Sequence, residues 1–226
     1  VSLLAGKRWI HDWYADWRGR HPTLEGFVAA DGAGTVARSE ADLDRAIRDV
    51  GAAGGEVLLK GLLGTSGSRH QRLLPGQAWR TTLPRWVETE LERGGVAVQP
   101  LFDRLADLSA QLEVRPERTK ILGIRQFLVD RRFQYRGTVL SSRLSGLDPE
   151  LRRHWHEEAF GEAWRTLLHD LGRGLAAAGY RGPVGVDAFL FRRPDGTPAL
   201  HPCIEINPRY TLGRVALAVE RLVYPG

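Results

Sequence analysis

Two carboxylates and an amide lie near the end of the sequence in a pattern that could bind a metal ion. Asp187 is in the apolar segment GVDAFLF, and Glu205 and Asn207 are in the next one, ALHPCIEIN. Residues two apart on a strand share a face, so Glu205 and Asn207 would point the same way. A hairpin turning between the segments would place Asp187 beside them. Such oxygen ligands suit Mg²⁺, which also binds phosphate oxygens. Alternatively, Glu205 and Asn207 face solvent and Asp187 pairs with an arginine.

A lysine ends the apolar segment GEVLLKG, and the glycine-rich stretch GLLGTSGSRH overlaps and follows it. Backbone N–H groups in such a loop can wrap an anion, and Lys60 at the strand end could reach the same phosphate. The stretch lacks the Gly-Lys-Ser/Thr ending of a Walker loop and the spacing of a dinucleotide site. By itself it also fits a plain hairpin loop. The lysines are only Lys7, Lys60 and Lys120 among 32 basic residues, which indicates that position 60 needs a compact ammonium group.

The positive charge is concentrated in one part of the chain. The net charge is +5 and the isoelectric point is near 9.8. Residues 113–153 alone hold ten basic and five acidic residues. This segment either forms a solvated basic face or meets an anionic partner.

A zinc site and a reactive cysteine are both disfavoured. His154 and His156 are two apart and diverge on a helix, so they cannot share a zinc ion. Cys203 lies in an apolar strand without a nearby histidine, as a packing residue does.

The elements that must position these residues follow from hydrophobic periodicity and from glycine and proline positions. Helices are predicted over residues 1–20 with a tryptophan stripe, 39–51 with Ser39 as N-cap, 77–93 and 148–178. Strands are predicted at GEVLLKG, HQRLL, GVAVQPLF, LADLSAQLEV, KILGIRQFLVD, FQYRGTVLSS and the two segments that carry the acids. This mixture predicts an α+β fold with antiparallel sheets rather than a regular βαβ alternation.

Composition bounds the location and the class of protein. No apolar run reaches the roughly 18 residues of a membrane span, and no secretory signal is present. A single cysteine excludes an internal disulfide and fits a reducing cytoplasm. The chain begins with valine and has no methionine, so we expect a processed chain or a piece of a longer protein.

The joint order of these motifs resembles the ATP-grasp superfamily. A strand ending in lysine, a Gly/Ser loop, the segment VAVQPLF, an acid, and then GVD and EINPR appear in that sequence, covering roughly residues 1–215. The resemblance implies an ATP-grasp fold of two α+β subdomains with antiparallel sheets that grip a nucleotide between them. Residues 1–98 would form the small subdomain with the N-terminal helix and the lid loop, and residues 99–226 the large one with the metal-binding strands.

The resemblance also implies a role for each candidate residue. Lys60 and Lys7 would contact ATP phosphates, and the backbone near Gln99 and Leu101 would hold adenine. Asp107, or with less support Asp103, would bind the ribose. The lid over the phosphates would consist of Gly64, Thr65, Ser66, Gly67 and Ser68. Mg²⁺, with Mn²⁺ as an alternative, would be held by Asp187, Glu205 and Asn207, and the catalytic arginines would be Arg209, for the phosphoryl group, and Arg125, for the carboxylate or acyl phosphate.

The implied activity is that of a ligase. ATP would convert a small-molecule or peptide carboxylate into an acyl phosphate, which an amine would attack to form a C–N bond. Family members carry a further N-terminal domain, so a missing domain or a second subunit would complete the site. Two other classes stay open, namely a non-catalytic or regulatory ATP-binding module and, with less support, a basic nucleic-acid-binding domain. We expect a cytoplasmic protein with no membrane partner.

Overall fold

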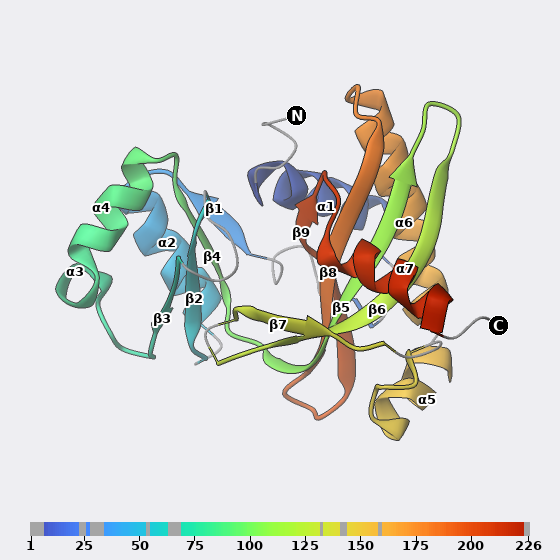
Figure 1. The fold of residues 1–226 in the computed structure, drawn as a ribbon. Helices are drawn as coiled ribbons and strands as arrows, with labels where there is room; N and C mark the ends of the chain where they lie inside the picture. Colours follow the sequence, from blue (N-terminus) through green and yellow to red (C-terminus); the bar gives the residue numbers. More distant parts are fainter. Residues whose placement is uncertain are drawn as a thin grey trace.

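The computed structural model describes residues 7–22, 26–27, 34–52, 55–62, 69–131, 133–140, 144–157 and 160–223. Their strands form two antiparallel sheets, one of four strands in the order β1-β4-β2-β3 and one of five in the order β7-β6-β5-β8-β9. Figure 1 shows the sheets in two lobes, with the four-stranded sheet at left and the β6–β7 hairpin reaching toward it. The observed mixture of helices and antiparallel sheets confirms the predicted α+β class.

The four-stranded sheet buries one face against its own helices. Its elements are β1 (Thr35–Ala37), α2 (Glu40–Gly51), β2 (Val57–Gly61), β3 (His70–Leu73), α3 (Trp79–Thr82), α4 (Pro84–Glu92) and β4 (Val96–Pro100). Val57 and Leu59 of β2 join this core with Val98 of β4. Alternation along the strands therefore turns Lys60 and Gln99 to the opposite face, toward the other lobe.

Local signals set the helix boundaries in this lobe. Ser39 Oγ accepts a hydrogen bond from the Asp42 N–H at 3.1 Å, which confirms the predicted N-cap of α2. The predicted helix over 77–93 is instead two pieces that meet at Leu83, whose φ of −135° is not helical. A proline disfavours the helical conformation in the residue before it, so Pro84 accounts for the break.

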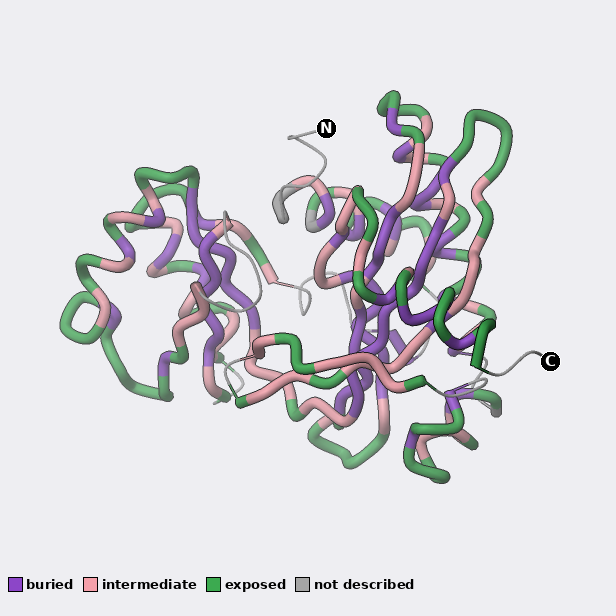
Figure 2. Tube along the Cα trace, in the orientation of Figure 1, coloured by how far each residue is buried: buried purple, intermediate pink, exposed green. Residues whose placement is uncertain are grey.

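The five-stranded sheet packs one face against α6, with α1 along β9. Its elements are α1 (Lys7–Arg20), β5 (Asp103–Val114), β6 (Thr119–Val129), β7 (Tyr135–Thr138), α5 (Pro149–Glu157), α6 (Phe160–Ala177), β8 (Gly182–Arg192), β9 (Pro198–Asn207) and α7 (Leu212–Val223). Leu108, Val186 and Ala188 lie in this core with Leu167 and Leu171 of α6. Figure 2 shows the buried residues concentrated in the central strands of both sheets.

Two expectations about the helices are corrected. The single helix predicted over 148–178 is two helices, α5 and α6, and the Trp155 ring of α5 packs edge-on against Trp164 and close to Gly161 of α6. The resemblance to ATP-grasp proteins groups the N-terminal helix with the small subdomain of residues 1–98. In the structure Trp17 and Tyr14 of α1 are buried in the core of the five-stranded sheet.

Candidate active site

The polar face of the five-stranded sheet, opposite the core face, gathers most of the candidate residues. Asp107 and Ser109 alternate along β5, and Ser109 pairs with Asp187 of β8 on one side and with Arg125 of β6 on the other. Asp187 is in turn directly opposite Glu205 of β9, which confirms the predicted hairpin register. Residues paired across antiparallel strands project to the same face, so the carboxylates of Asp187 and Glu205 are neighbours.

The donors around Asp187 are short side chains from the adjacent strands. Ser109 Oγ donates a hydrogen bond to Asp187 Oδ1 at 2.7 Å, and Asn207 Nδ2 donates to Asp187 Oδ2 at 3.1 Å. Arg209 Nη2 donates to Asn207 Oδ1 at 3.0 Å. Among the described residues, Glu205 has neither a hydrogen-bond nor an ion-pair partner. The two carboxylates of the cluster therefore carry more negative charge than Arg209, the cation beside them, balances.

The electrostatic environment of Asp187 reflects this imbalance. The pKa of Asp187 is raised to about 7, mainly by burial; the hydrogen bond from Ser109 opposes the rise, and the negative charges of Glu205 and Asp107 contribute to it. Arg209 gives a smaller, opposing contribution. A divalent cation would supply the missing charge, and carboxylate and amide oxygens are ligands that Mg²⁺ accepts. The donor set therefore fits a hard cation, although no group of three His, Cys, Asp or Glu side chains arranged for a metal occurs in the described ranges.

Lys60 approaches this face from the four-stranded sheet. Its side chain is only 6% exposed and donates a hydrogen bond to Gln99 Oε1 at 3.0 Å. Its charge also acts on Asp107 of the other sheet. Burial raises the pKa of Asp107, whereas Arg104, paired with it at 2.8 Å, and Lys60 act to lower it. The two sheets therefore face one another across one charged site.

Arg104 is a site residue that the sequence analysis missed. It is largely buried, pairs with Asp107 and lies with its guanidinium 4.0 Å from the ring centre of Phe189. Burial lowers its pKa, and the charges of Asp107 and Asp187 oppose that shift. The Phe133 ring lies 5.0 Å from the same guanidinium and 5.4 Å from that of Arg72 of β3, so it joins the lobes. Ser109 was missed too, although the alternation of polar residues from Asp107 along an apolar strand could have shown it.

The remaining candidates have varied surroundings. Arg125 is paired with Glu220 of α7, so its charge is already compensated. The Leu101 N–H donates to the Glu56 carbonyl at 2.8 Å, and the Gln99 amide is bound to Lys60. Asp103 is exposed at the start of β5, 3.5 Å from Arg192. Lys7 begins α1, but its side chain is not among those described, and the predicted lid Gly64, Thr65, Ser66, Gly67 and Ser68 lies outside the described residues.

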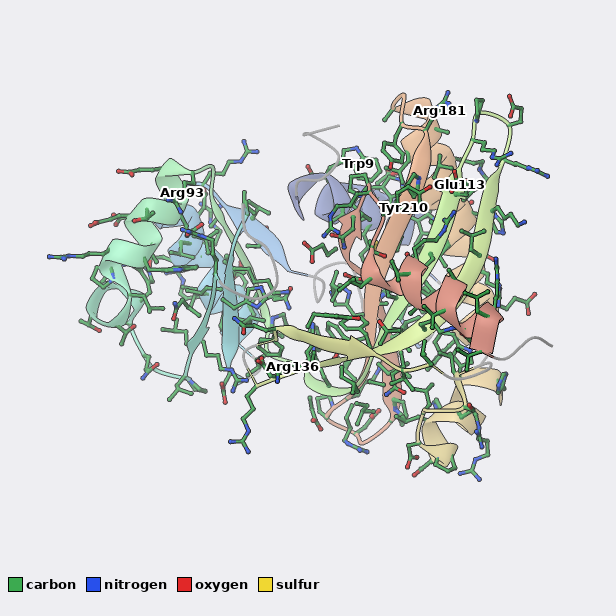
Figure 3. All side chains as sticks on the ribbon, viewed as in Figure 1. Trp9, Arg93, Glu113, Arg136, Arg181 and Tyr210 are labelled. Atoms are coloured by element: carbon green, nitrogen blue, oxygen red, sulfur yellow. The ribbon has the colours of Figure 1, made fainter. Side chains whose placement is uncertain are left out.

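Helix α7 closes one end of the polar face. The Thr211 hydroxyl donates to Gln111 Oε1 at 2.7 Å, and Gly185 has no room for a side chain because Thr211 lies against it. In Figure 1 this helix crosses in front of the sheet, and Figure 3 shows Tyr210 just before it near the upper part of β9. None of the helices in the described part of the chain has the length and apolar character needed to cross a membrane.

Comparison with known proteins identifies the fold. No protein-family model and no curated protein matches the sequence. Among solved structures, the biotin carboxylase domain of Hydrogenobacter thermophilus 2-oxoglutarate carboxylase, in complex with MgADP, ADP and bicarbonate, matches 100% of this chain with a TM-score of 0.61 and 14% identity. The biotin carboxylase of Campylobacter jejuni matches 96% of it with a TM-score of 0.59 and 14% identity.

A third similar structure comes from another enzyme. The N5-carboxyaminoimidazole synthetase of Staphylococcus aureus, complexed with ADP, matches 82% of this chain with a TM-score of 0.53 and 12% identity. The chain spans 43%, 43% and 42% of the lengths of these three proteins, less than half of each. At such identities the likeness shows the fold alone, and that fold is ATP-grasp, as the sequence motifs predicted.

Proposed function

We propose that this ATP-grasp chain carries the ATP-binding and phosphoryl-transfer site of a Mg²⁺-dependent ligase that joins a carboxylate to an amine. The observation that supports it is the adjacent pair Asp187 and Glu205, short of positive charge and facing a buried lysine from the other sheet. The neighbours add support, because one is a biotin carboxylase domain in complex with MgADP and bicarbonate and another is a synthetase complexed with ADP.

The residues divide the work by charge. Asp187, Glu205 and Asn207 would hold the metal, which supplies positive charge to phosphate oxygens when it is bound. Lys60 would bind a phosphate as a point charge held by β2 and Gln99, and Arg209 would stabilise the phosphoryl group in transfer. Phosphoryl transfer depends mainly on such positioning and charge neutralisation. Lys7 and Gly64–Ser68 stay in the proposal as further phosphate contacts.

The reaction would run in two steps in a site that excludes water. The substrate carboxylate would attack the γ-phosphorus, ADP would leave, and an amine would displace phosphate from the acyl phosphate. Arg125 would act on the carboxylate only if its pairing with Glu220 were exchanged. Asp107 would accept hydrogen bonds from ribose hydroxyls, and the backbone near Leu101 would hold adenine. A cytoplasmic location belongs to the proposal, since Cys203 is a free, buried thiol.

A second candidate is an ATP-binding module without ligase activity. It is favoured by one observation, namely that the chain spans less than half of each similar protein, so a further domain or subunit would supply the second substrate's site. ADP release measured over a panel of carboxylates, with hydroxylamine as the nucleophile, separates the two. If the chain is a ligase, ADP and a hydroxamate should form only when Mg²⁺ and a carboxylate are present. Neither product should form with Glu205→Gln. Tight ATP binding without turnover on any carboxylate would indicate the module, and absence of ATP binding would refute both.

A further inference from the structure

A groove of about 380 Å³ lies on the helix-covered side of the five-stranded sheet, away from the candidate active site. One wall is the start of β6 and the other is α6; the lining residues are Arg118, Thr119, Lys120, Ile121, Arg165 and His169. Figure 1 shows α6 behind the sheet on the side of β6, and in Figure 3 Glu113 marks β5 near the end that leads into the β5–β6 turn. Asp187 projects from the opposite face, since Val186 and Ala188 beside it are packed in the core with α6.

The charges around this groove are one-sided. Arg118, Lys120, Arg165 and His169 line it, and within the described ranges none of the four is in an ion pair. Lys120 lies opposite Glu113, so its side chain projects to the other face of the sheet, and the charged groups on the α6 side are those of Arg118 and Arg165. Many other arginines in the same ranges are paired, including those with Asp44, Glu113 and Glu220 as partners. The groove therefore has two arginines, Arg118 and Arg165, that no ion pair in the described chain compensates.

The nearest acids do not neutralise it. Glu113, opposite Lys120 in the sheet, pairs with Arg214, and Asp170, next to His169, pairs with Arg173 and accepts a hydrogen bond from Trp17. The exposed Glu117 and Glu162 neither line the groove nor pair with its cations among the described residues.

The walls are held in place by packing. Gly172 of α6 lies so close to Thr119 that no side chain fits there, which fixes the helix against β6. Arg165 and His169 are four apart and share one face of α6. Strand β7 pairs with β6 only at Phe127–Val129, so the part of β6 beside the groove forms a sheet edge without a strand partner in the described chain.

We propose that this groove binds a small anion of the phosphate or polyphosphate class that carries two or more negative charges. Its volume is at the lower end of small-molecule sites. Arginine presents N–H groups in a fork that matches phosphate oxygens, and the Thr119 hydroxyl adds a donor. Like charges on a rigid scaffold repel, and a multivalent anion relieves that repulsion at several residues together. The inference does not depend on the proposed ligase activity.

Calorimetric titration with inorganic pyrophosphate at constant ionic strength tests the proposal. We expect saturable binding in wild type that persists in Lys60→Met, which removes the phosphate-binding lysine of the other face. Arg165→Ala and Arg118→Ala should each weaken binding about tenfold or more. Arg85→Ala, an exposed helical arginine of the other lobe, should leave it unchanged. Circular dichroism melting checks that each variant is folded.

The same variants separate the groove from other anion sites. ATP binding should be the same in Arg165→Ala as in wild type. The proposal is overturned if pyrophosphate shows no saturable binding, if Arg165→Ala and Arg118→Ala bind it like wild type, or if Lys60→Met abolishes it. A short single-stranded oligonucleotide that binds the groove more tightly than pyrophosphate would also overturn it, in favour of a nucleic-acid surface.

Discussion

Asp187→Asn should stabilise the metal-free protein at alkaline pH. The pKa of Asp187 is raised from 3.8 to about 7 by burial and by neighbouring carboxylates. Between these values the folded state binds a proton that the unfolded state does not, so wild-type stability falls as pH rises from about 4 to about 7 and is level above that. An asparagine is neutral throughout and avoids this loss.

The magnitude follows from the shift. About three pKa units at ~1.4 kcal/mol each give an upper limit of ~4 kcal/mol above pH 7. The asparagine keeps an acceptor for Ser109 but places an NH₂ group against the Asn207 amide, which costs about 1 kcal/mol or more. We therefore expect a gain of about 2 to 3 kcal/mol at pH 8, little or none near pH 4, and no gain in saturating Mg²⁺ if the ion compensates the wild-type charges.

Urea unfolding of wild type and Asp187→Asn, at pH 4.5 and at pH 8 with EDTA, measures the difference in their free energies of unfolding. The contributions of the other titrating groups are common to both proteins and cancel in this difference. Asp195→Asn is the control of opposite sign, because hydrogen bonds from Thr197 lower the pKa of that exposed aspartate. A variant less stable than wild type at pH 8, or a difference that does not change with pH, would refute the account of Asp187.

Three further substitutions test the packing around the site. Glu220→Ala leaves the largely buried Arg125 without its partner and should lower the free energy of unfolding by about 3 kcal/mol in urea; less than about 1 would mean that the pair is solvated. Ser39→Ala removes the N-cap of α2 and should cost about 1 kcal/mol by thermal melting, with no change contradicting the cap. Gly172→Ala should destabilise by about 1 to 3 kcal/mol, whereas Gly19→Ala, with open space around it, should be neutral or stabilising; equal effects would refute the packing.

Local features of this fold were readable from the sequence. The pairing of Asp187 with Glu205 could be predicted, because a hairpin is short and strand alternation fixes which side chains share a face. The cap at Ser39 could be predicted because it is also local: it joins two residues that are three apart in the sequence.

The contacts that could not be predicted join distant segments. Glu220 forms an ion pair with Arg125, which is 95 positions away in the sequence, and no local pattern indicates this pairing. Tertiary packing also placed α1 on the five-stranded sheet, and α5 and α6 are separate helices whose Trp155 and Trp164 rings pack edge-on, a contact between residues nine apart that periodicity does not indicate. Arg104 was missed since an arginine in a basic chain carries no signal until its partners Asp107 and Phe189 are seen.

The central claim is that Lys60 from one sheet and the Asp187–Glu205 pair from the other act on the same nucleotide. Calorimetric dissociation constants for ATP with Mg²⁺, measured for wild type, Lys60→Met, Glu205→Gln and the double variant, test it directly. The account predicts that each single change weakens binding. It also predicts that the effect of the double variant differs from the sum of the two single effects by more than about 0.5 kcal/mol. Additive effects, or wild-type affinity in either single variant, would contradict it.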